Sequence, residues 1–102
     1  MANDRSHEFE PPPPPSSTRG RGQYALDGIR WILARRFEIP WRGVNLHSRF
    51  VEDLGIDAFD LPDLILALEE AFEVDIPTVA AARVSTVKDA VICVLRRERE
   101  GH

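Results

Sequence analysis

The sequence predicts an all-α domain, a four-helix bundle with a long first loop and a short third helix. Apolar residues recur at spacings of three and four along separate segments after residue 23, which is the period of an amphipathic helix. No stretch has the alternation of apolar and polar residues that is typical of a half-buried strand. With 102 residues, the chain is long enough for one small folding unit.

The first 22 residues differ in composition from the rest. They contain a five-proline run at 11–15 and almost no apolar side chains, so they cannot bury enough surface to offset the entropy lost on ordering. We predict a disordered Pro-rich tail over 1–22, with polyproline II conformation at 11–15, and a folded domain over 23–102. The tail is either a solubilising spacer or a ligand for an aromatic-lined groove.

The first helix is predicted from about 24 to 37, where one apolar stripe consists of Leu26, Ile29, Leu33 and Phe37. Pro40 and Gly43 then open a long connection. Its apolar side chains have no strand period, so we expect an ordered loop pinned across the helices rather than a free one. These side chains are Ile39, Val44, Leu46, Phe50, Val51 and Leu54.

The second helix has the clearest pattern. Its core face consists of Leu61, Leu64, Ile65, Leu68 and Phe72. Because proline is disfavoured inside a helix, we place Asp60 at the N-cap, Leu61 and Pro62 as the first helical residues, and Ala58 in the preceding turn.

Two further helices follow. The segment IPTVAAARV predicts a short third helix, with Pro77 suited to its first turn. Ser85 is the candidate N-cap of a fourth helix. The core side of that helix consists of Val87, Ala90, Val91, Val94 and Leu95.

The order of these elements and three motifs resemble the acyl carrier protein family. The motifs are FVEDLGID before the second helix, DLPDLILALEEAFEVDIP along and after it, and VSTVKDAV at the fourth. The resemblance covers nearly all of residues 24–98 and makes 23–102 an acyl-carrier-protein-like domain. It implies a role in fatty-acid, lipid or polyketide-type biosynthesis, with intermediates held on 4′-phosphopantetheine attached to a serine in an Asp-Ser-Leu motif.

That motif falls on Asp57, Ala58 and Phe59, so an alanine stands where the family has its modified serine. A phosphodiester requires a hydroxyl oxygen, which a methyl group lacks. The nearest hydroxyl residue in sequence, Ser48, lies ten residues upstream. As its sequence stands, the chain therefore cannot carry phosphopantetheine, and the cofactor is expected only if the native protein has serine at position 58.

A surface for partners is nevertheless predicted. From Phe50 to Ala82 there is no lysine or arginine, whereas 52–75 contains nine acids. Leu66 lies off the core stripe of the second helix, among acidic side chains, which suits a partner with an apolar notch and a basic rim. The alternative is that the acids merely solvate the helix. The candidate docking residues are Asp60, Asp63, Leu66, Glu70 and Glu73.

The resemblance implies acyl-chain synthases, acyltransferases and a phosphopantetheinyl transferase as partners of a monomeric protein. The net charge of −4 argues against nucleic acid, and no apolar run approaches the roughly 20 residues of a membrane span. A single cysteine, Cys93, and the absence of a recognisable targeting segment favour the cytoplasm.

We expect no enzymatic activity and no metal site. The histidines are isolated, Cys93 has no catalytic partner, and the acids lie on a convex helix rather than in a cleft. Three interpretations remain open. The chain is an unmodifiable Ser-to-Ala form of a true carrier, a native docking or regulatory homologue without cargo, or a helical adaptor whose Pro-rich tail binds partners.

Overall fold

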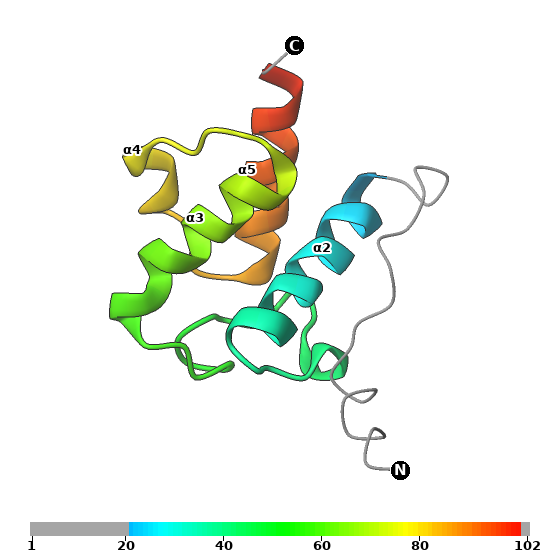
Figure 1. The fold of residues 1–102 in the computed structure, drawn as a ribbon, viewed down its shortest axis with the longest axis vertical. Coiled ribbons are helices and arrows are strands. Elements are labelled where there is room, and N and C mark those ends of the chain that lie inside the picture. The colour runs from blue at the N-terminus through cyan, green and yellow to red at the C-terminus, as the bar shows by residue number, and fades with distance from the viewer. Residues whose placement is uncertain (1–20, 101–102) are drawn as a thin grey trace.

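The computed structural model describes residues 21–100, which form a bundle of helices (Figure 1). The α-helices are α2 (Arg21–Arg36), α3 (Leu61–Phe72), α4 (Thr78–Ala81) and α5 (Val87–Glu100). Two 3-10 turns, η2 (Trp41–Gly43) and η3 (Ala58–Asp60), lie in the long connection between α2 and α3. Over these residues there is no strand, so the predicted all-α fold with a long first loop and a short third helix is confirmed.

No helix within the described part of the chain is both long enough and apolar enough to cross a membrane.

Helix α2 begins at Arg21, three residues before the predicted start. The Nη2 atom of Arg21 donates a hydrogen bond to Oε1 of Glu98 on α5, over 2.9 Å. This contact joins positions 77 residues apart, so the local apolar period could not reveal it. The composition places Arg21 and Gly22 in the tail, but both belong to α2. The rest of the predicted tail, residues 1–20, lies outside the described residues.

The core lies between α2, α3, α5 and the long loop. Each helix contributes the apolar face that its period predicts, and the loop adds Val44, Phe50 and Ile56. Leu46 and Val51, also expected to pin the loop, are exposed instead. The side chains least accessible to solvent are Phe50, Ile29, Leu33, Leu64, Leu68, Val44, Val87 and Val94.

Backbone hydrogen bonds attach the loop to the start of α5. The amide N–H of Val87 donates to the carbonyl oxygen of Ser48, and that of Lys88 donates to the carbonyl of Leu46. These amides belong to the first turn of α5, whose donors have no partner within the helix. The loop thus stabilises α5 while α5 fixes the path of the loop.

The N-cap of α5 is Thr86, one residue later than predicted. Oγ1 of Thr86 accepts from the N–H of Asp89, and Oδ2 of Asp89 accepts from the N–H groups of Ser85 and Thr86. This reciprocal pattern is a capping box in which aspartate takes the place usually held by glutamate. These hydrogen bonds hold the pKa of Asp89 below its ordinary value, and the bond from the backbone N–H of Ser85 has the largest effect.

The short helix α4 also starts one position later than predicted. Pro77 has extended backbone angles and lies at the N-cap, so the first helical residue is Thr78.

Gly28 lets α3 approach α2 closely. A Cβ atom at Gly28 would lie 2.5 Å from Cζ of Phe72, so only glycine leaves room for that ring. Tyr24, one turn earlier on α2, contacts the same ring edge-on with 5.9 Å between centroids. The glycine therefore serves packing in a helix interior where its own propensity is unfavourable.

We predict that Gly28→Ala destabilises the domain by about 1–3 kcal/mol, because overpacking outweighs the gain in helix propensity. Urea unfolding would measure the change. Gly22→Ala is the matched control in the same helix, since nothing lies within 4 Å of a Cβ built there. Equal stabilities for the two variants would contradict the close contact.

Candidate docking site

Ala58 is the first residue of η3, the turn that precedes α3. Asp57 lies just before the turn with extended backbone angles, and its Oδ1 accepts from the N–H of Phe59 at 2.9 Å. The carbonyl oxygen of Asp57 accepts from the N–H of Asp60 at 2.8 Å. Ala58 is exposed, so its methyl group faces solvent in a turn that hydrogen bonds hold in place.

The predicted start of the second helix is confirmed, with Asp60 at the N-cap position and Leu61 and Pro62 as the first helical residues. Asp60 nevertheless has helical backbone angles, and its side chain makes no capping hydrogen bond. The N–H of Leu61 already bonds to the carbonyl of Ala58, so η3 continues directly into α3. Because the chain turns helical before Asp60, the capping side chain is the earlier acid, Asp57.

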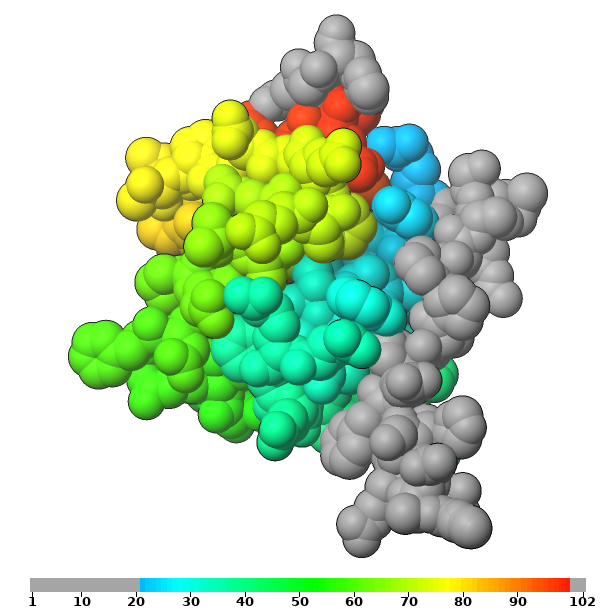
Figure 2. Space-filling model, viewed as in Figure 1, coloured from blue at the N-terminus to red at the C-terminus, as the bar shows by residue number. Residues whose placement is uncertain are grey.

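Two apolar side chains stand out on this surface. Phe59, in η3, is 91% exposed, and Leu66, in α3, is 49% exposed. Figure 2 shows the green segment that contains η3 projecting from one edge of the molecule. The sequence indicated the exposure of Leu66 through its helical position. It gave no signal for Phe59, because a turn residue has no helical face.

Some of the surrounding acids are exposed and form no ion pair with another described residue, whereas others contact groups of the same chain. Glu70 and Glu73 are exposed, and Glu73 ends α3 in the left-handed conformation, with φ 56°. Nη2 of Arg36, on α2, lies 3.6 Å from Oδ1 of Asp63. Oε2 of Glu69 accepts from the N–H of Ile76, so this acid fixes the segment between α3 and α4.

A second ion pair lies in the long loop. Hydrogen bonds from Arg49 hold the pKa of Asp53 below its ordinary value, and Asp53 in turn raises the pKa of Arg49. Fewer acids are therefore available to a partner than the nine in the sequence of 52–75. The available acids centre on η3 and the exposed side of α3.

Ser48, the hydroxyl residue nearest to Ala58 in sequence, does not replace the missing hydroxyl. Ser48 is buried, and its Oγ accepts the N–H of Asn45, so this side chain serves the loop. Among residues 21–99 there is also no group of three or more potential metal ligands. The arrangement offers a surface for contact, without a nucleophile at position 58.

A family model described as a phosphopantetheine attachment site matches residues 27–94. The chain belongs to this family. The match runs from the middle of α2 to α5 and includes η3, so it covers the fold and the candidate site together. Carrier domains of this family generally lack catalytic activity and interact with synthases and acyltransferases.

The residues of this phosphopantetheine-attachment domain do not fit the prosthetic group itself. The turn at 58–60 is capped by Asp57, but Ala58 supplies no oxygen for a phosphodiester. Membership of the family thus accounts for the fold and leaves the use of this site to be explained.

We predict that Asp57→Ala lowers the free energy of unfolding by about 0.5–1 kcal/mol, because the Phe59 amide loses its side-chain acceptor. Hydrogen exchange of that amide should accelerate as well. Asp60→Ala removes an equally exposed carboxylate that caps nothing, so it should leave both quantities nearly unchanged. An equal or larger loss with Asp60→Ala would contradict the assignment of the cap to Asp57.

Proposed function

We propose that this chain is a docking domain without cargo, which occupies the place of a carrier on an enzyme of fatty-acid, lipid or polyketide-type biosynthesis. The observation that carries the proposal is the side chain of Ala58. It is exposed in a capped turn, at the position where the family resemblance expects the modified serine, yet it has no atom to which the prosthetic group can be joined. The domain would therefore bind where carriers bind and deliver nothing.

Phe59 would be the anchor of the contact. Burying a fully exposed phenylalanine contributes about 1.5–3 kcal/mol, and aromatic residues dominate the energetics of many interfaces. Its position next to Ala58 means that a partner that approaches the attachment turn meets this ring first. Leu66, on the exposed side of α3, would add a second apolar contact.

The acids would guide the encounter. Asp60, Glu70 and Glu73 form no ion pair with another described residue, so their charge is available to a synthase or acyltransferase with a basic surface. Asp63 would contribute less, because Arg36 offsets its charge. Such steering mainly raises the association rate and weakens as salt is added. We propose no catalytic role, and we expect the domain to act in the cytoplasm.

We predict that Ala58→Ser restores attachment. Incubated with coenzyme A and a broad-specificity phosphopantetheinyl transferase, the variant should gain the mass of the prosthetic group, whereas the unaltered chain should not. Intact-mass spectrometry would check both, with thermal unfolding to verify that the variant folds alike. If the serine variant also stays unmodified, the turn with Phe59 and Pro62 is not read as an attachment site, and the proposed mimicry of a carrier is contradicted.

We also predict that the unaltered chain inhibits acyl transfer from a loaded carrier to its acceptor by an acyltransferase that uses carriers. Phe59→Ser should weaken inhibition about tenfold, which corresponds to about 1.4 kcal/mol of binding. Leu66→Ala should act in the same direction. Ile92→Ala is the control, because this 41% exposed side chain lies on α5. Equal weakening by all three substitutions would contradict a docking surface centred on η3 and α3.

A further inference from the structure

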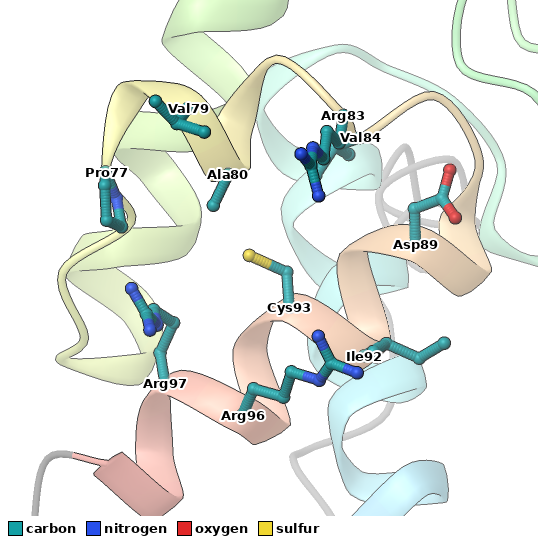
Figure 3. Close-up of a pocket in the computed structure, with 10 residues that line it drawn as sticks. All are labelled: Pro77, Val79, Ala80, Arg83, Val84, Asp89, Ile92, Cys93, Arg96 and Arg97. Atoms are coloured by element: carbon teal, nitrogen blue, oxygen red, sulfur yellow. The ribbon is translucent and has the colours of Figure 1, made fainter.

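A groove between α4 and α5 lies apart from the proposed docking surface. Its volume is about 470 Å³, and its lining residues come from both helices and from the segment between them (Figure 3). Val79 from α4, 69% exposed, and Ile92 from α5, 41% exposed, both line it. Two exposed apolar side chains in one groove indicate a surface suited to an apolar ligand.

The groove also carries positive charge. Arg83 and Arg96 line it, and neither forms an ion pair with another residue of the described chain. Figure 3 shows their guanidinium groups and that of Arg97 around the thiol of Cys93. Asp89 is the acid among the lining residues, and its carboxylate accepts the hydrogen bonds of the α5 cap. The groove therefore suits a ligand that combines carboxylates with an apolar or aromatic group.

One segment of this chain has that chemistry. Residues 8–10 read Glu-Phe-Glu, and the proline run 11–15 follows directly. We propose that residues 8–15 bind in the groove of the same molecule, with the two glutamates at the arginine rim and Phe9 against the apolar lining. Prolines favour this because polyproline II conformation is preformed and loses little entropy on binding.

The start of α2 makes the contact possible within one molecule. The ion pair between Arg21 and Glu98 holds that end of α2 beside α5, and Arg97, the residue before Glu98, lines the groove. Five residues, 16–20, connect the bound segment to Arg21 and can span up to about 17 Å, and residues 11–15 continue the path along the groove. The 14 residues of α5 extend about 21 Å, so the Glu-Phe-Glu stretch can lie as far from Arg21 as the opposite end of α5.

Tethering makes even a weak contact effective. A segment held by a short connection has an effective concentration in the millimolar range, so an affinity too weak between separate molecules suffices within one. The inference does not rest on the proposed docking function, because its residues lie outside η3 and α3.

The test uses the full chain, with Cys93 as the reporter. Burial raises the pKa of the thiol, and a segment bound in the groove should shield it further. We expect Glu8→Gln together with Glu10→Gln to raise the rate of alkylation by neutral iodoacetamide about threefold, the factor expected from losing two surface ion pairs. Phe9→Ser should also raise it. High salt should raise the alkylation rate of the unaltered chain close to that of the double variant, because salt screens the ion pairs.

The matched control is Glu38→Gln together with Glu52→Gln, which changes the net charge equally outside the groove and should leave the rate unaltered. Amide chemical shifts provide a second measurement, since the Glu8 and Glu10 substitutions should move the signals of Val79, Arg83, Ile92 and Arg96. An unchanged rate with unchanged shifts overturns the proposal. Protection of the Cys93 thiol that is lost on dilution also overturns the proposal, because the contact would then join two molecules. Protection by free decanoate, with no effect of the tail substitutions, would assign the groove to a small anionic amphiphile instead.

Discussion

The attachment of the long loop to α5 is the constraint on which the rest of the structure depends. Phe50 is fully buried, and its N–H donates to the carbonyl of Ser85 while its carbonyl accepts from Ile56. The loop carbonyls of Leu46 and Ser48 take the first amide donors of α5. A connection of this length without secondary structure would be costly to order on its own. It is ordered because it satisfies a helix terminus that would otherwise lack partners.

The same attachment sets up the candidate site. Gly55, with φ 78°, turns the loop, and Ile56 enters the core, so Asp57 emerges at the surface where η3 begins. Helix α3 is then held against α2 through Phe72, whose ring fills the space that Gly28 leaves open. The exposure of Phe59 follows from this arrangement, because η3 lies at the rim between a pinned loop and a packed helix. The exposed surface of η3 and α3 is thus positioned by the core.

Position 58 separates two properties that a carrier domain combines. The covalent property needs one hydroxyl oxygen, and no packing or hydrogen bonding can supply it to an alanine. In the proposed function, the recognition property would depend on a turn, an exposed ring and several carboxylates, such as those found around η3 and α3. An alanine at position 58 leaves that surface unaltered, because its side chain is exposed and supports nothing in the core. This independence is the physical basis of the proposed cargo-free role.

The sequence predicts the helical periods, the core faces of α2, α3 and α5, and the missing hydroxyl at position 58, because each depends on residues within a few positions or on a single side chain. The fold, in contrast, makes Asp57 rather than Asp60 the capping side chain, lets Arg36 offset the charge of Asp63, and extends α2 to Arg21. It also brought the arginines and apolar side chains of α4 and α5 into one groove. These features depend on contacts between residues far apart in the chain or on the continuity of neighbouring turns, which a local pattern does not encode.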